Sequence, residues 1–219
     1  MTVRRVALFC LGFGFFAAFT LFSFIVHKNL LMQFDFNTTV HLQDHISRRF
    51  DLLFSYFSVM GSFEIMSVIL LVILAFRHKL KDIIYLFGFG VILLFELFGK
   101  FFVDHPGPPF RFARYVSLVQ FPTEYIPQPS GSYPSGHAGR TLFVSTMFVS
   151  FVLSSKKLPL YIKYLIVSGV ILFDIIMLVS RVYLGEHWTT DVIGGTLLGI
   201  SLGLFARFVD TLGTKKALK

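Results

Sequence analysis

Long and nearly uncharged apolar runs are the feature of this sequence that most restricts its fold. Runs near residues 6–26, 83–103, 160–180 and 189–208 are each close to the length of helix that crosses a bilayer, which is roughly 20 residues. A soluble helical protein would instead spread its apolar residues at helical spacing along amphipathic helices. The composition agrees, because 55% of the residues are hydrophobic and 15% are charged, whereas soluble domains carry about 25% charged residues. We therefore predict a membrane protein.

Two further apolar runs, near residues 52–76 and 138–154, bring the predicted number of transmembrane helices to six. All are expected to be helical, because backbone that faces lipid must satisfy its hydrogen bonds within its own segment. The first run is longer than a signal-peptide core and lacks a small-residue cleavage site after it, so we expect a retained span. The prediction is an all-α polytopic membrane protein, with one bundle of six transmembrane helices as a single domain over residues 1–219.

The basic residues indicate how the chain is oriented in the membrane. With a cytoplasmic N-terminus, twelve of the 20 Lys and Arg residues fall on the inner side, opposed there only by Asp82 and Asp210. The twelve are Arg4, Arg5, Arg77, Lys79, Lys81, Lys156, Lys157, Lys163, Arg207, Lys215, Lys216 and Lys219. By the positive-inside rule, both termini are cytoplasmic and the long loops 27–51 and 104–137 are outside. The net charge of +8 thus reflects topology, and without a basic stripe of interleaved aromatics we predict no nucleic-acid binding.

The two outer loops differ in composition. Residues 27–51 carry mixed charge, which is compatible with an amphipathic helix at the membrane surface. Residues 104–137 contain most of the prolines, which excludes a continuous helix there; they are Pro106, Pro108, Pro109, Pro122, Pro127, Pro129 and Pro134. A long structured loop in so compact a protein is usually functional. We expect it to contribute to a site.

Polar residues are concentrated between the last two predicted spans, from Ser180 to Asp191. His187 and Asp191 are four residues apart, so on a helix they would share a face. A carboxylate there can accept the Nδ1 proton of the imidazole and leave Nε2 free for nucleophilic attack. Arg181 offers a planar set of donors that suits phosphate oxygens. Taken alone, the segment also fits an interfacial His–Asp pair with an arginine that anchors a helix end.

The segment Tyr133 to His137 precedes the fourth predicted span. Ser135 is a good N-cap, and Gly136 allows backbone to approach a ligand closely. If the helix begins here, its first amides form an anion site beside His137. A simple turn before a helix is the alternative.

Lys100 lies near the outer end of the third predicted span, one turn after Glu96. By itself this pair fits a lysine that extends to the headgroups. The predicted topology, however, places Lys100, His137 and the segment 181–191 on one face of the membrane, as a phosphate site requires. Glu96 is expected to pair with Lys100, and Glu64 and Asp174 to bond neighbouring helices, an ion pathway being the alternative.

These segments resemble the membrane branch of the type 2 phosphatidic acid phosphatase family. The family pattern is a Lys, six residues and Arg-Pro; then Pro-Ser-Gly-His; then Ser-Arg, five residues, a His, three residues and an Asp. The last two motifs match in full, at Pro134 to His137 and at Ser180, Arg181, His187 and Asp191. In the first motif Lys100 and Pro108 are in place, but Gly107 holds the arginine position. Candidates to replace that arginine are Arg111, Arg114, His105 and, as the preferred one, Arg140.

The resemblance implies a metal-independent lipid phosphatase without a cofactor or an obligate protein partner. His187 would attack phosphorus while Asp191 orients its ring, and His137 would serve as general acid and then as general base. The phosphate oxygens would be bound by Lys100, Arg181, Ser135 and the Gly136 amide, with Arg140 added by our own inference.

The lipid itself stays open among undecaprenyl pyrophosphate, phosphatidylglycerophosphate and phosphatidic acid, each presented by the bilayer at the headgroup level. A site on the extracytoplasmic side of the cell membrane favours the polyprenyl pyrophosphate. Three other hypotheses about the function stay open: a phosphotransferase that uses the same phosphohistidine, a non-catalytic binder of lipid phosphates, and a transporter or channel.

Overall fold

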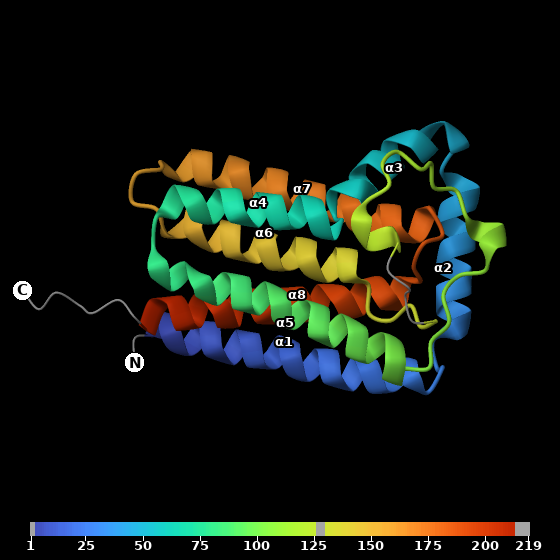
Figure 1. Cartoon of the computed structure of the whole chain (residues 1–219), viewed down its shortest axis with the longest axis horizontal. Helices are drawn as coiled ribbons and strands as arrows, with labels where there is room; N and C mark the ends of the chain where they lie inside the picture. The colour runs from blue at the N-terminus through green and yellow to red at the C-terminus, as the bar shows by residue number, and fades with distance from the viewer. Residues whose placement is uncertain (1–2, 126–129, 213–219) are drawn as a thin grey trace, which may run out of the picture.

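The computed structural model describes residues 3–125 and 130–212, and the regular structure in these ranges is helical (Figure 1). The bundle is made by α1 (Val3–His27), α4 (Phe63–Arg77), α5 (Ile83–Phe102), α6 (Gly136–Ser154), α7 (Leu160–Tyr183) and α8 (Thr189–Leu212). Within the described ranges there is no β-strand, and only an isolated bridge joins Pro106 to Gly131. The predicted all-α fold is confirmed.

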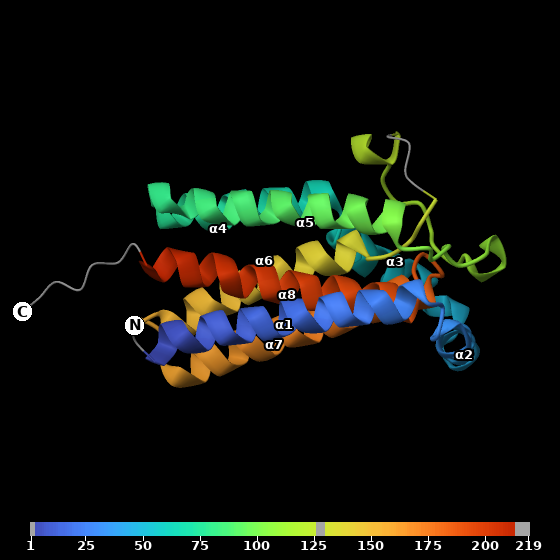
Figure 2. The same ribbon diagram turned by 90° about the horizontal axis from the view of Figure 1, so that it is seen from below.

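Helices α6 and α8 occupy the middle of the bundle, with α4 and α5 on one side and α1 and α7 on the other (Figure 2). Their backbones touch because glycines face each other across the contact. A Cβ added at Gly199 would collide with the carbonyl oxygen of Gly139, and one at Gly195 with that of Ser135. Small residues at such contacts let transmembrane helices approach closely. The two helices that carry His137 and Asp191 are therefore the most tightly joined.

The run 52–76, predicted as one helix, is broken. It forms α3 (Asp51–Met60) and α4, whose axes differ by 54°. Ser62 accepts a hydrogen bond from the Ile65 amide at 3.4 Å and thereby starts α4 as its N-cap. Because hydropathy continues across this break, the apolar pattern did not reveal it. The bend directs α3 across the loop-bearing end of the bundle, beside α7 (Figure 1).

Four helices are long and apolar enough to cross a membrane, and the bent α3–α4 pair would be a fifth. They are α1, α7, α8 and the segment Leu80–Phe102, which contains α5. Helix α6 lies beside them in the bundle, but His137 and Arg140 in its first turns lower its hydropathy. The chain is thus a multi-pass membrane protein, and the count of six spans remains a prediction.

The two loops predicted to be outside form a layer at one end of the bundle. The helix predicted within residues 27–51 is present as α2 (Met32–His45), which runs across the bundle axis (Figure 1). A short turn, η1 (Arg48–Phe50), links it to α3. The proline-rich loop is irregular as predicted, with two short turns, η3 (Phe110–Phe112) and η4 (Pro122–Tyr125). Pro127 and Pro129 lie outside the described residues.

The opposite end of the bundle carries both ends of the described chain (Figure 1). There Arg77 pairs with Asp82 at 2.7 Å and Lys81 pairs with Asp210 at 2.6 Å, next to the short turn η2 (Leu80–Asp82). Asp82 and Asp210 are the only two acids in the segments predicted to lie on the inner side. Three of the predicted inner lysines, Lys215, Lys216 and Lys219, lie outside the described residues. The bundle therefore has one end with the predicted inner charges and another with the outer loops.

Candidate active site

The predicted contact between His187 and Asp191 is present, with Nδ1 3.2 Å from Oδ2. The prediction that the two residues share a helix face was wrong, because only Asp191 lies on a helix. α8 begins at Thr189, so His187 lies in the preceding loop. Asp191, in the first turn of α8, also accepts the Trp188 amide at 2.9 Å. One carboxylate thus bonds the start of the helix and orients the imidazole.

The loop before His187 needs a left-handed residue, which Gly185 supplies at φ 70°. A Cβ there would also collide with the carbonyl oxygen of Phe112 in the proline-rich loop. The His187 side chain that this turn presents is almost completely buried. Burial, with Arg181 and Lys100 nearby, holds the pKa of His187 well below its ordinary value. The imidazole is therefore neutral at neutral pH, the form in which it can act as a nucleophile.

The helix start predicted at Ser135 is confirmed, since α6 begins at Gly136 and the Ser135 hydroxyl accepts the Ala138 amide at 3.5 Å. A Cβ at Gly136 would displace the carboxylate of Glu96, which pairs with Lys100 and Arg140. His137 follows on the first turn, where the charges of Arg181, Arg140 and Lys100 act on it. The structure thus brings together the motif segments that are widely separated in sequence.

Glu96 joins two of the candidate phosphate-binding cations. Its Oε1 lies 2.8 Å from Lys100 Nζ, which confirms the predicted pair. Its Oε2 lies 2.6 Å from Arg140 Nη1, a contact that the sequence did not indicate. Arg140 is buried, with 5% of its surface exposed, so it does not anchor the helix at the headgroups. One carboxylate therefore sets the positions of both cations.

The third cation, Arg181, is held by two residues that sequence reasoning missed. Its Nη1 contacts Ser58 Oγ and Glu186 Oε2, and the Ser58 hydroxyl donates to the same Glu186 oxygen at 2.8 Å. Glu186 directly precedes His187 in the motif, and this position in the sequence could have indicated a role in the site. Ser58 gave no signal, because the bend after α3 brings it to the site.

The four candidates for the missing family arginine lie in different places. Arg111 packs on the ring of Phe112 at 5.1 Å, and Arg114 lies over the ring of Tyr183 at 5.3 Å. His105 faces the carboxylates of Asp35 and Asp191. Only Arg140, of these four, shares a carboxylate with Lys100.

The remaining intramembrane acids have local partners. Asp174 on α7 accepts a hydrogen bond from Ser145 on α6 at 2.7 Å, so the predicted bond between helices is present. Glu64 instead accepts the amide and hydroxyl of Thr123 in the outer loop, at 3.2 and 2.8 Å. The prediction of a neighbouring helix as the partner of Glu64 was wrong, since this residue lies in the first turn of α4, next to the loop.

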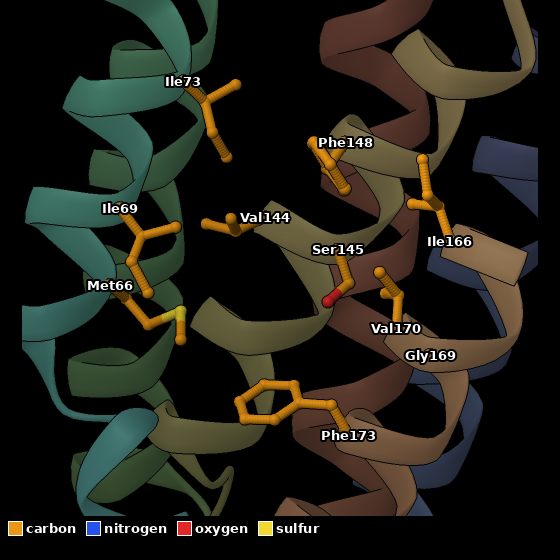
Figure 3. Close-up of a pocket in the computed structure, with 10 residues that line it drawn as sticks. All are labelled: Met66, Ile69, Ile73, Val144, Ser145, Phe148, Ile166, Gly169, Val170 and Phe173. Atoms are coloured by element: carbon orange, nitrogen blue, oxygen red, sulfur yellow. The ribbon is translucent and has the colours of Figure 1, made fainter. Parts of the chain in front are cut away.

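An apolar cavity of about 480 Å³ lies between α4, α6 and α7 (Figure 3). Met66, Val144 and Phe173 line it from the three helices, and Ser145 is the one polar side chain that Figure 3 labels. Apolar space of this kind suits a hydrocarbon chain better than a polar group.

A helical membrane bundle that gathers histidines, carboxylates and three cations at one end defines a candidate phosphate-processing membrane protein. Residues 81–211, more than half of the chain, match the model of the PAP2 superfamily. The match spans all three motifs. The chain belongs to the PAP2 superfamily.

Three curated relatives are similar to parts of the chain. An undecaprenyl-diphosphatase of Sulfolobus acidocaldarius is 36% identical over 112 residues, which are 51% of this chain and 47% of the relative. A phosphatidylglycerophosphatase B of Bacillus subtilis is 36% identical over 89 residues, 39% of this chain and 42% of the relative. A dihydrosphingosine 1-phosphate phosphatase of Saccharomyces cerevisiae is 30% identical over 152 residues, 68% of this chain and 36% of the relative. The chain spans less than half the length of each.

Two solved structures share the fold. One is a transmembrane PAP2 type phosphatidylglycerolphosphate phosphatase from Bacillus subtilis, with a TM-score of 0.75 and 20% identity over 94% of this chain and 98% of that one. The other is LpxE from Aquifex aeolicus, with a TM-score of 0.59 and 20% identity over 78% and 93%. At this identity the likeness shows the fold alone.

Proposed function

We propose that this chain is a lipid phosphatase that hydrolyses a lipid phosphate or pyrophosphate through a phosphohistidine on His187. The observation that carries the proposal is the His187–Asp191 contact at 3.2 Å. With Nδ1 bound to the carboxylate, Nε2 is the nitrogen left for phosphorus. The charges of Arg181 and Lys100 act on this ring, as expected beside a phosphate site.

In the first step His187 Nε2 forms a bond to phosphorus, and the bond from phosphorus to the leaving oxygen breaks. His137, which becomes protonated once the anionic phosphate offsets the neighbouring cations, donates its proton to that oxygen, while Asp191 stabilises the positive His187 ring. Charge spreads over the phosphoryl oxygens in such a transfer. Lys100, Arg181 and Arg140 would bind those oxygens, together with the hydroxyl of Ser135 and the backbone amide of Gly136.

In the second step His137 takes a proton from water, whose oxygen attacks phosphorus. The bond from phosphorus to nitrogen breaks, and inorganic phosphate and neutral His187 result. A phosphotransferase would differ only here, by using the hydroxyl of another molecule in place of water.

The proposed substrate is a lipid phosphate held at the extracytoplasmic surface, with undecaprenyl pyrophosphate as the preferred one. Support comes from the relatives, whose names specify lipid phosphates and diphosphates. We propose metal independence because side-chain cations supply positive charge at the site.

The test is phosphate release by the purified protein in detergent from undecaprenyl pyrophosphate, phosphatidylglycerophosphate and phosphatidic acid. The wild type should release phosphate from at least one lipid, with excess EDTA present, and His187→Ala should abolish release. His45→Ala is the matched control, because this histidine is exposed on α2. More than a few per cent of wild-type activity in folded His187→Ala, or loss with EDTA that a divalent ion restores, would refute the mechanism.

A further inference from the structure

His105, from the proline-rich loop, lies on the other side of Asp191 from His187. Its Nε2 is 3.5 Å from Asp191 Oδ1, whereas His187 Nδ1 approaches Oδ2. The same nitrogen lies 3.6 Å from Asp35 Oδ2 on α2 and 3.1 Å from Thr190 Oγ1. His105 is 4% exposed. A second imidazole is therefore buried against the carboxylate that orients the proposed nucleophile.

The contacts determine which nitrogen of His105 carries the proton. The Thr190 hydroxyl donates to Asp35 Oδ2 at 2.7 Å, so its oxygen is left as an acceptor for the ring. Nε2 then faces only oxygen acceptors, from Thr190, Asp35 and Asp191. An unprotonated Nε2 would repel all three. Burial lowers the pKa of His105, and Asp191 and Asp104 oppose this only in part. The ring is thus neutral, with the proton on Nε2.

Asp35 and the loop backbone hold this ring in place. Asp35 is 1% exposed and also accepts the Thr190 amide at 2.8 Å, which ties α2 to the start of α8. Burial raises the pKa of Asp35 to about 6. On the other side, the amide and hydroxyl of Ser132 donate to the His105 carbonyl oxygen at 2.9 and 3.0 Å. The Trp188 indole, next to His187, donates to the Pro106 carbonyl oxygen at 2.8 Å.

We propose that His105 is a positioning residue for Asp191. Its Nε2–H donates to Thr190 Oγ1 at 3.1 Å and lies 3.5 Å from Asp191 Oδ1, so it holds the start of α8 and keeps the neighbouring carboxylate aimed at His187, with Asp35 as a support for Thr190. A fully buried carboxylate is costly unless several donors face it. Asp191 is 0% exposed, and the phosphohistidine step needs it as an anion beside a positive ring. Partners behind an orienting group hold it in the productive geometry. This inference rests on the proposed function.

The proposal also explains why His105 does not replace the arginine missing at Gly107. Its Nε2 faces two carboxylates and a hydroxyl, which are acceptors, so it has no donor directed at phosphate. Within the described part of the chain, its Nδ1 has no hydrogen-bond partner. In this neutral tautomer Nδ1 is an acceptor, which phosphate oxygens would repel.

Two substitutions separate hydrogen-bond donation from packing. His105→Phe keeps an aromatic ring and removes the donor, whereas His105→Gln keeps an N–H group in a smaller side chain. The proposal predicts that His105→Phe lowers kcat by about tenfold to a hundredfold with little change in KM, as loss of such supporting partners does. His105→Gln should retain more activity. A Phe variant as active as the wild type, or equal losses in both variants, would overturn the proposal.

A double-mutant cycle shows whether His105 acts through Asp191. In an Asp191→Asn background, His105→Phe should change kcat by less than about twofold, because the carboxylate that it positions is gone. A full additional loss would indicate a structural role and overturn the proposal. Thermal unfolding in detergent is measured for each variant, with His45→Phe as the control. A wild type that releases no phosphate would refute the proposed function itself. An active wild type together with a fully active His105→Phe variant would refute only the role of His105.

Discussion

At the scale of single residues, the charges of the site are held by carboxylates that come from distant segments. Glu96 bonds both Lys100 and Arg140, and Glu186 bonds Arg181. The sequence could predict the pair of Glu96 with Lys100, because the two are one helical turn apart. It could not predict the pair with Arg140, since only the packing of α5 against α6 brings these two residues together. Local spacing thus predicted part of the site, and tertiary packing determined the rest.

Arg140 provides the first prediction at this scale. Arg140→Ala should lower kcat by about tenfold to a thousandfold, because a preorganised donor to phosphate is lost. Arg140→Lys should recover only part of the rate, since a point charge cannot form two parallel hydrogen bonds. Steady-state phosphate release measures both.

Position 107 offers a rescue experiment for the same arginine. Among the described residues, a Cβ at Gly107 would meet only Ser132 Cβ, at 3.5 Å, so the backbone can carry a side chain there. Gly107→Arg should partly restore activity to Arg140→Ala by returning an arginine to the family position. Wild-type rates in Arg140→Ala alone would reject the role of Arg140 and leave Arg111 and Arg114 to be tested.

At the scale of elements, helix starts were easier to predict than helix breaks. The start of α6 followed from Ser135 and Gly136, which form a recognisable capping segment. The break between α3 and α4 was missed because apolar residues flank Gly61 and Ser62 on both sides. That break matters for the site, since α3 carries Ser58 to Arg181. Hydropathy indicates that a segment is apolar and does not indicate whether it is straight.

The contact between α6 and α8 yields the second prediction. Gly199→Ala should destabilise the protein by about 1–3 kcal/mol, because the new methyl group meets the Gly139 carbonyl and forces the helices apart. Turnover should fall as well, since these helices carry His137 and Asp191. Thermal unfolding and phosphate release are the measurements.

Gly90→Ala on α5 is the matched control for that change. Its new Cβ would have no neighbour within 4 Å in the described part of the chain, so stability and turnover should stay near wild-type values. Equal effects of the two substitutions would show that the close contact between α6 and α8 is not what matters.

At the scale of the whole molecule, the polarity of the bundle agrees with the charge pattern. The site and the loop layer lie at one end, and Arg77, Lys81 and Arg207 pair with Asp82 and Asp210 at the other. The sequence predicted this division from charge alone. The fold itself does not specify which end faces the cytoplasm, because membrane insertion determines the orientation of the chain. The proposed orientation therefore rests on the distribution of basic residues.

Cysteine labelling tests the proposed orientation. In a Cys10→Ser background, Ser117→Cys in the outer loop should react with an impermeant thiol reagent in intact cells or spheroplasts. Ser117 is exposed, so access does not limit the reaction. Lys156→Cys, between α6 and α7, should react only after the membrane is permeabilised. The reverse pattern would place the site in the cytoplasm and remove the argument for undecaprenyl pyrophosphate.

The proposed mechanism requires that His187 becomes phosphorylated during turnover. Reaction with a radiolabelled lipid pyrophosphate, followed by rapid quenching without acid, detects the phosphorylated protein. The wild type should carry label that is stable in alkali and lost in acid, as expected for phosphohistidine. His137→Ala should accumulate more of it, because the base that activates water is missing and a pyrophosphate leaving group needs little protonation. His187→Ala should carry none. Phosphate release by the wild type with no protein-bound label in any variant, or label that persists in His187→Ala, would contradict the mechanism.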